Sequence, residues 1–182
     1  MKMKQSRLLF VGVTLEALLF LVLFFTHADC GDLFRLSARY TGRISFGLYI
    51  VMFYYFIFER SRKLPLVKTK VWGMVFCVLH LIHFGFLSAS VYFNDLPIIP
   101  VKLAGGFLAY LAIVIYPFFI QGVSKLWIHV FYFYYVGFVM GMTFLSRIKG
   151  DFEGADPSWF HYFGLLVLAL MFLIGVIKLL KK

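Results

Sequence analysis

Six long apolar runs make up most of the sequence, at about residues 8–26, 41–58, 71–93, 103–121, 126–146 and 159–180. An α-helix needs roughly 20 mainly apolar residues to cross the hydrocarbon layer of a bilayer, so each run is long enough for a transmembrane helix. The composition agrees, because 63% of the 182 residues are hydrophobic and 21% are aromatic, more than a soluble domain usually carries. We predict an all-α membrane protein, a single six-transmembrane-helix bundle over residues 1–182.

The connections between the runs are short, the longest being residues 27–40 and 147–158. Neither is long enough for a folded domain that binds a nucleotide or a flavin. A soluble catalytic domain is therefore not expected in this chain.

The first run follows a basic start, MKMKQSR, as the apolar part of a signal peptide does. We predict a retained helix, because the run is longer than a usual signal-peptide core and contains Glu16. The segment THADCGD that follows it also lacks a clean cleavage site.

Basic residues set the predicted orientation, because cytoplasmic loops retain lysine and arginine in excess. With the N-terminus inside, both termini are cytoplasmic and 12 of the 18 basic residues lie on the cytoplasmic side. These twelve are Lys2, Lys4, Arg7, Arg60, Arg62, Lys63, Lys68, Lys70, Lys125, Lys178, Lys181 and Lys182. The other six, Arg35, Arg39, Arg43, Lys102, Arg147 and Lys149, are balanced by acids of the same loops. The net charge of +10 is thus explained by the orientation of the helices in the membrane and by attraction to the lipid bilayer. It gives no reason to expect a nucleic-acid partner.

Four acidic, basic or histidine side chains lie about one turn or more inside the ends of the predicted helices, where each costs free energy unless it is paired. They are Glu16, His80, His83 and His129. His80 and His83 are three residues apart, so they share one helix face, about 5 Å apart, and could bind a metal, a heme iron or a proton. A buried histidine can equally bond a hydroxyl or a carbonyl, and Glu16 can be protonated and bonded to a neighbouring helix or act as a proton relay.

His129 lies early in the fifth run, where it can face His80. The third and fifth runs are both predicted to cross from inside to outside, so residues early in each can lie opposite one another. Opposed imidazoles hold a b-type heme through both axial positions of the iron, which favours one-electron transfer. The two depths differ, because at 1.5 Å per residue His80 lies roughly 13 Å and His129 roughly 5 Å above its helix start.

Four segments between about residues 40 and 144 resemble the ferric-reductase-like transmembrane domain family. They are TGRISFGLYIVMFYY with the basic loop ERSRK after it, VWGMVFCVLH ending at His80, VKLAGGFLAYLAIVIYPFFIQ, and LWIHVFYFYY containing His129. Within that family, the similarity is closest to the heme-b membrane subunits that are partnered with a periplasmic methionine sulfoxide reductase. The resemblance implies a multi-pass protein of a bacterial inner membrane.

By this resemblance, His80 and His129 are the axial ligands of a heme iron. His83, the neighbour of His80, is a further candidate cofactor-binding residue whose role stays open. The protein is then a membrane electron-transfer subunit with a single heme b, itself non-catalytic. Its redox partner in trans is a flavoprotein, quinol or a periplasmic oxidoreductase. Family members carry further histidines where this chain has Asn94 and Met142, so a second heme site is expected to be absent unless the Met142 thioether supplies a ligand.

Two other functions stay open at this point. A heme-free bundle of the same fold, acting as a binding or assembly partner, is favoured by the missing histidines and by the difference in depth. A small transporter that uses Glu16 and His83 as a proton relay is the third hypothesis, although the sequence shows neither an inverted repeat nor a pair of broken helices.

Overall fold

The computed structural model describes residues 2–98, 100–151 and 157–180, with side chains described from residue 5 and, after residue 98, from residue 104. These residues form six α-helices: α1 (Lys2–Thr26), α2 (Cys30–Ser61), α3 (Val67–Phe93), α4 (Pro100–Phe119), α5 (Leu126–Lys149) and α6 (Trp159–Leu180). The described part of the chain contains no strand. The predicted all-α fold is confirmed.

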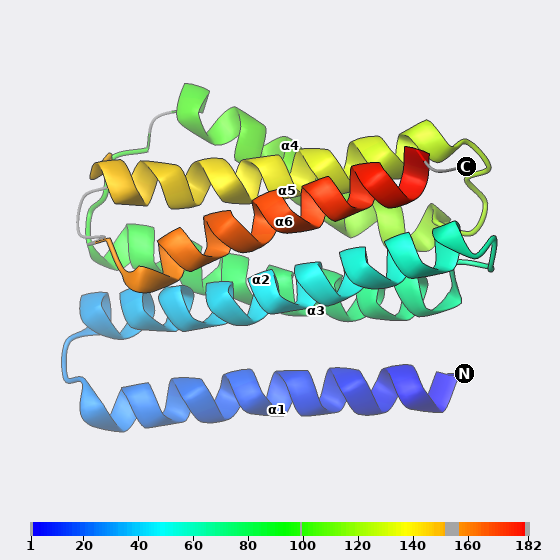
Figure 1. The fold of residues 1–182 in the computed structure, drawn as a ribbon. Helices are drawn as coiled ribbons and strands as arrows, with labels where there is room; N and C mark the ends of the chain where they lie inside the picture. Colours follow the sequence, from blue (N-terminus) through cyan, green and yellow to red (C-terminus); the bar gives the residue numbers. More distant parts are fainter. Residues whose placement is uncertain (1, 99, 152–156, 181–182) are drawn as a thin grey trace.

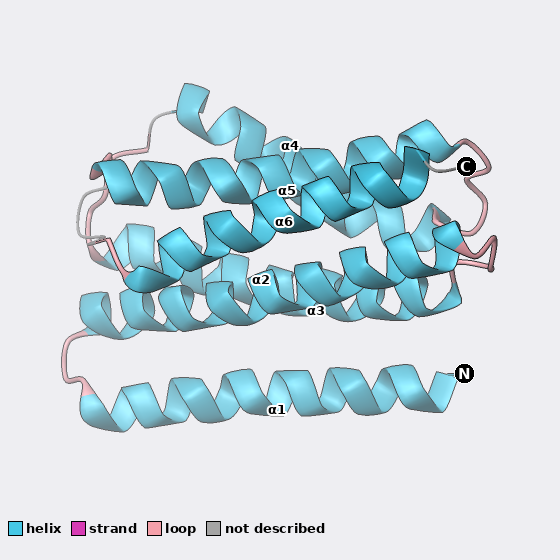
Figure 2. Ribbon diagram, in the orientation of Figure 1, coloured by secondary structure: helices cyan, strands magenta, loops and turns pink. Residues whose placement is uncertain are grey.

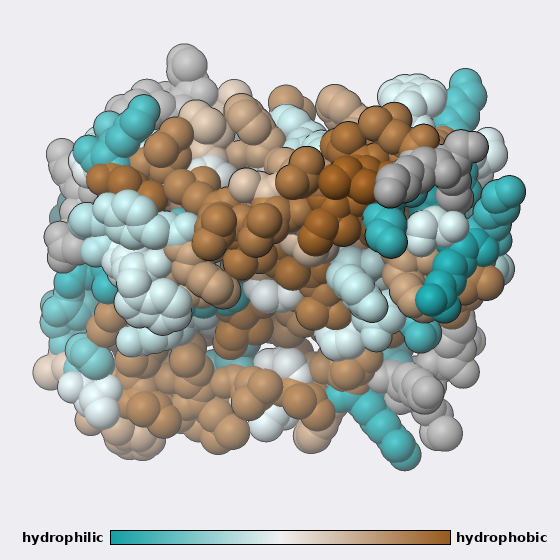
Figure 3. Space-filling model, in the orientation of Figure 1, coloured by the Kyte–Doolittle hydropathy of each residue, from teal (hydrophilic) through white to brown (hydrophobic). Residues whose placement is uncertain are grey.

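The length and hydropathy of the helices make the chain a multi-pass membrane protein. Five helices are long and apolar enough to cross a membrane, namely α1 from Gln5, α2, α3, α5 and α6. The apolar part of α4 whose side chains are described, Ala104–Phe119, is shorter than these. On the face drawn in Figure 3, hydrophobic side chains gather over the middle of the helices and hydrophilic ones gather toward both ends.

Four helices close a ring at the centre of the bundle, in the order α2, α3, α4 and α5, with α5 packing back on α2. Within this ring, α3 and α5 lie on opposite sides. α6 covers α5 and α2, and α1 lies against α3 and α2. Figures 1 and 2 show the helices running side by side with both termini at one end. We call this end the terminal end, and the opposite one, where α1, α3 and α5 finish and α2, α4 and α6 begin, the far end.

The second helix begins well before the predicted residue 41, so most of the predicted connection at residues 27–40 is helical. Asp29 is the N-cap of α2, with φ −88° and ψ 129°, and its carboxylate accepts the backbone N–H of Asp32 at 2.8 Å. Asp32 also pairs with Arg35 in the next turn. The boundary prediction was wrong because this first part of the helix is stabilised by a cap and by charged side chains, which a hydropathy scan does not register.

A single carboxylate fixes the connection between α2 and α3 at the terminal end. Glu59 is only 3% exposed, and it accepts the backbone N–H groups of Lys68 and Thr69 at 2.8 and 3.0 Å. It also accepts the Thr69 hydroxyl at 2.7 Å. The first N–H groups of a helix have no partner within the helix, and a negative charge there is favoured by the helix dipole. Glu59 therefore caps α3 from the end of the preceding helix.

Aromatic rings fill the centre of the helix ring. Tyr49, Phe53, Phe56, Phe76 and Phe133 are fully buried. The rings of Phe56 and Phe133 stack with centroids 4.4 Å apart, and the Tyr49 hydroxyl donates to the Phe133 carbonyl at 2.6 Å. These contacts join α2, α3 and α5 through one continuous aromatic core.

Candidate functional site

His80 lies in the wall of this core, and its neighbour His83 lies on the same face of α3. The two imidazole centroids are 5.4 Å apart, as the spacing of the residues predicts. The His80 ring stacks on Tyr110 of α4 at 4.6 Å and contacts Phe76 at 5.0 Å. Its Nδ1 is buried and has no hydrogen-bond partner among the described residues. His80 is thus held by ring packing, while its Nδ1 accepts or donates no hydrogen bond within the described part of the chain.

His83 is held by a hydroxyl of α2. Its Nδ1 lies 3.1 Å from the Thr41 Oγ1, and that hydroxyl donates its only hydrogen to the Ser37 carbonyl at 2.8 Å. We therefore assign the shared hydrogen of the first contact to Nδ1 of His83. Gly42 permits the close approach, because a Cβ at this position would lie 3.0 Å from the His83 Cε1. His83 thus has the geometry of a packing histidine bonded to a hydroxyl.

Both ring nitrogens of His129 are engaged. Nε2 lies 2.9 Å from the Val123 carbonyl and Nδ1 lies 2.6 Å from the Tyr116 hydroxyl. A carbonyl only accepts, so Nε2 carries the hydrogen and Nδ1 accepts from the tyrosine. The ring is 1% exposed, and the Tyr116 ring that bonds it is itself stacked on Tyr132 at 3.7 Å. His129, near the start of α5, is therefore hydrogen-bonded both to α4 and to the loop that joins the two helices.

The structure does not bring His80 and His129 into contact, because the aromatic core lies between them. Phe76 contacts His80 at 5.0 Å and Tyr49 at 6.1 Å, and on the other side Phe56 contacts His129 at 5.9 Å. Bis-imidazole ligation needs a flat slot between two imidazoles, each with a free nitrogen. The described side chains do not fit a heme b at this place.

Metal ligation by a larger cluster also finds no support. Within residues 5–98, 104–151 and 157–180, no group of three or more histidine, cysteine, aspartate or glutamate side chains is arranged to hold a metal ion. His80 and His83 therefore have no third side chain of these types placed beside them to complete a metal site among the described residues.

Glu16 is a buried carboxyl in the middle of α1. Its side chain on α1 is 1% exposed, and neither carboxyl oxygen has a hydrogen-bond partner among the described residues. The helix around it packs closely on α3, where Gly12 accommodates the Leu79 side chain. The expected bond from Glu16 to a neighbouring helix is therefore not found in this part of the structure, and the carboxyl is cheapest to bury when protonated.

Asn94 and Met142, which stand where the resembling family has further histidines, have other surroundings here. The Asn94 Nδ2 donates to the Gly31 carbonyl at 3.0 Å and to the Ser90 carbonyl at 2.8 Å. It thereby joins the end of α3 to the start of α2. Met142 is 44% exposed on α5, away from any buried site.

The sequence analysis missed the residues that partner these histidines, namely Tyr110, Tyr116 and Thr41. Each contacts a histidine on another helix, 13 residues or more away along the chain. No spacing rule connects residues on different helices, so only the presence of polar groups in apolar runs could have pointed to them.

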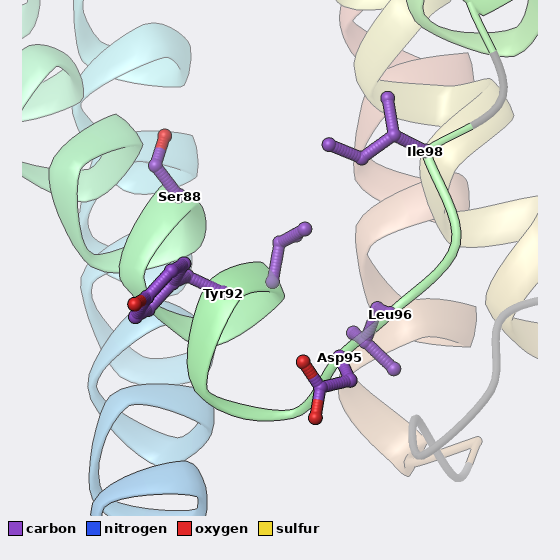
Figure 4. Close-up of a pocket in the computed structure, with 6 residues that line it drawn as sticks. Ser88, Tyr92, Asp95, Leu96 and Ile98 are labelled. Carbon is purple, nitrogen blue, oxygen red and sulfur yellow. The ribbon is translucent and has the colours of Figure 1, made fainter.

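A shallow hollow of about 330 Å³ lies at the far end, beside the end of α3. Figure 4 shows Ser88 and Tyr92 on the helix, with Asp95, Leu96 and Ile98 on the chain that leaves it. None of the predicted ligands lines this hollow. It is thus separate from the histidine sites.

Comparison of the chain with protein-family models, with curated proteins and with solved structures finds no match. Function must therefore be inferred from the arrangement of the described side chains.

Proposed function

We propose that the protein is a heme-free membrane bundle that acts as a binding or assembly partner in the membrane. One observation carries the proposal: both nitrogens of the His129 ring are bonded, to the Tyr116 hydroxyl and to the Val123 carbonyl. A ligand to iron must present a nitrogen lone pair, and here the lone pair of Nδ1 is taken by the tyrosine while Nε2 carries a hydrogen.

The packing of the core supports the same conclusion. A heme between α3 and α5 would have to displace buried rings such as Phe53 and Phe56, which are 0% exposed and stacked on Phe133 at 5.0 and 4.4 Å. Each large aromatic ring contributes several kilocalories to a core, about 3–5 kcal/mol when it is truncated to alanine. A core that these rings already fill leaves no space for a heme, which agrees with a role as a binding or assembly partner.

The test is a dithionite-reduced minus oxidised absorption spectrum of protein that was expressed with ample heme and purified in detergent. We expect a featureless difference spectrum in the wild type. A b-type α-band that disappears in both His80→Ala and His129→Ala would overturn the proposal.

A second candidate is the membrane electron-transfer subunit with one heme b, exchanging electrons with a flavoprotein, quinol or a periplasmic oxidoreductase. The specific observation in its favour is the buried Nδ1 of His80, which has no partner among the described residues. This candidate requires the His129 Nε2 to leave the Val123 carbonyl and the aromatic core to open. The same difference spectrum separates the two candidates.

The binding role has its own test, for which His80→Phe is the most informative variant. Phenylalanine keeps the ring that stacks on Tyr110 and Phe76 but has no nitrogen. If the protein is a heme-free partner, the His80→Phe variant is expected to restore the phenotype of a deletion strain as well as the wild-type chain does. Loss of complementation by a variant that is still present in the membrane at the wild-type level would contradict the proposal.

We also propose that the terminal end faces the cytoplasm of a bacterial inner membrane. The support is the excess of lysine and arginine on the segments predicted to lie inside, together with both termini at one end (Figure 1). Two native cysteines allow a direct test, because Cys30 is exposed at the far end and Cys77 is buried. A membrane-impermeant maleimide should label intact cells through Cys30, and Cys30→Ser should abolish the signal. Labelling only after the membrane is opened would reverse the orientation.

A further inference from the structure

Three arginines converge at the far end, and the proposed function does not account for them. Arg39 and Arg43 lie one turn apart on α2, and Arg147 lies in the last turn of α5. We call these three residues the arginine cluster. They occupy the end of the bundle at which α6 begins, and residues four apart on a helix share one face.

Aromatic contacts show that these side chains belong to one place. The Arg43 guanidinium lies over the rings of Tyr40 and Phe160, 5.2 and 5.0 Å from their centroids. The Phe144 ring, one turn before Arg147, lies 5.9 Å from both Phe160 and His161. Side chains of α2, α5 and α6 therefore meet around the start of α6.

The positive charges lie close enough to act on each other. Arg147 is within electrostatic range of Arg39 and Arg43, and all three arginines act on His161. Arg147 also acts on His83 across the bundle. Like charges brought together in a partly buried place repel strongly, so an anion among them would be stabilising.

Hydrogen-bond donors also gather here. The backbone N–H of Ser158 donates to the Nδ1 of His161 at 3.1 Å, so the neutral ring carries its hydrogen on Nε2. The Arg43 Nε and the Ser158 hydroxyl are buried without a hydrogen-bond partner among the described residues. The start of α6 adds the positive end of the helix dipole, which favours a bound anion.

We propose that the arginine cluster, with His161 and Ser158, binds the oxyanion of a phosphate group. Planar guanidinium groups match the oxygens of phosphate in two parallel hydrogen bonds, and stacking on Tyr40 and Phe160 orients one of them. The phosphate belongs either to a lipid headgroup at the membrane surface or to a soluble anion. This site stands independently of whether the core holds a heme.

The first arm of the test uses the wild-type protein in nonionic detergent. Its thermal unfolding midpoint is measured with sodium phosphate against sodium chloride at matched ionic strength, and with phosphatidylglycerol against an uncharged glycolipid. A ligand that binds only the folded state raises the midpoint. A rise with both phosphate probes indicates a site open to soluble anions, and a rise with phosphatidylglycerol alone indicates a headgroup site. No rise with either probe would overturn the proposal.

The second arm locates the site. Arg43→Gln and Arg147→Gln are each expected to weaken binding of the responding probe about tenfold or more, the usual size of one charged hydrogen bond. Arg62→Gln is the matched control, because the Arg62 guanidinium also lies over a ring, that of Phe58 at 4.2 Å, but at the terminal end. Equal weakening by Arg62→Gln would show a general charge effect and contradict the site.

The acids of the neighbouring loop need a control of their own. Asp151 is exposed, and Glu153 and Asp156 lie outside the described residues. A Glu153→Gln and Asp156→Asn double variant should bind the probe at least as tightly as the wild type. Binding that appears only in this variant, with none in the wild type, would mean that the loop acids already neutralise the arginines, and would refute the proposal.

Discussion

His129 and His80 are both buried histidines in the same helix ring, yet their surroundings differ. His129 is 1% exposed and has a hydrogen-bond partner on each nitrogen. His80 is 8% exposed, is held by the rings of Tyr110 and Phe76, and its Nδ1 has no partner among the described residues. Burial alone therefore does not distinguish a structural imidazole from one that is chemically available.

The difference shows what to examine in an intramembrane histidine. An imidazole whose two nitrogens are both bonded is part of the fold, and removing it leaves its partners unsatisfied. An imidazole held by ring stacking contributes mainly apolar contact, which another ring can replace. The two histidines should therefore respond differently to substitution.

The largest effect is expected from His129→Leu. This change removes the hydrogen-bond partner of the Tyr116 hydroxyl and of the Val123 carbonyl. Side-chain hydrogen bonds between membrane helices stabilise the fold by up to about 1.7 kcal/mol each. We expect a loss of about 2–3 kcal/mol in the free energy of unfolding, measured by titration with sodium dodecyl sulfate in mixed micelles. Phe131→Leu on the lipid-facing side of the same helix, where the ring is 63% exposed, is the control and should change little.

An unchanged unfolding free energy for His129→Leu would remove the basis of the comparison. It would mean that the Tyr116 hydroxyl finds another acceptor, and that His129 is as available as His80.

Most of the fold could be predicted from the sequence, because long apolar runs carry the membrane signal directly. α6 (Trp159–Leu180) begins and ends where the run at 159–180 does. α3 starts at Val67, four residues before the predicted 71, because Glu59 caps its first turn from another helix. The early start of α2 was missed for the same reason: caps are local polar contacts that hydropathy does not detect.

The candidate site was much less predictable. The spacing of His80 and His83 correctly placed both rings on one face, since helix geometry fixes that relation. The bond between Tyr116 and His129 depends on how two helices are rotated against each other, which neither sequence position encodes. The sequence did contain two warnings, the missing histidines at Asn94 and Met142 and the roughly 8 Å difference in depth between His80 and His129 at 1.5 Å per residue.

A smaller effect is expected from Tyr116→Phe, which sharpens the comparison by removing only one of the two bonds of His129. The Tyr116 ring stays and can still stack on Tyr132, so the loss should be about 1 kcal/mol. The measurement is again the unfolding free energy in mixed micelles. Tyr92→Phe, at a side chain that is 77% exposed, serves as the control, and a loss as large as that of His129→Leu would show that the tyrosine bond alone holds this connection.

Thr41→Val tests the third histidine of the group. Valine has nearly the same shape and removes the hydroxyl that His83 contacts at 3.1 Å, so we expect a loss of about 0.6 kcal/mol, the mean for side-chain bonds between membrane helices. Thr143→Val is matched to it, because the Thr143 hydroxyl also donates to a carbonyl one turn back, that of Val139 at 3.0 Å, and contacts no second helix among the described residues. Equal losses in the two variants would assign the whole effect to the bond within the helix.

The smallest effect is expected from His80→Phe. The substitution keeps an aromatic ring beside Tyr110 and Phe76 and removes a buried nitrogen that has no partner among the described residues. The free energy of unfolding should therefore stay within about 0.5 kcal/mol of the wild type, or rise, because an unpaired polar atom no longer has to be buried. His80→Ala separates packing from polarity, since it removes the nitrogen and the ring together and should cost about 2 kcal/mol through the space it leaves. A loss in His80→Phe as large as in His80→Ala would show that the nitrogen itself is bonded in the membrane, and the contrast with His129 would then disappear.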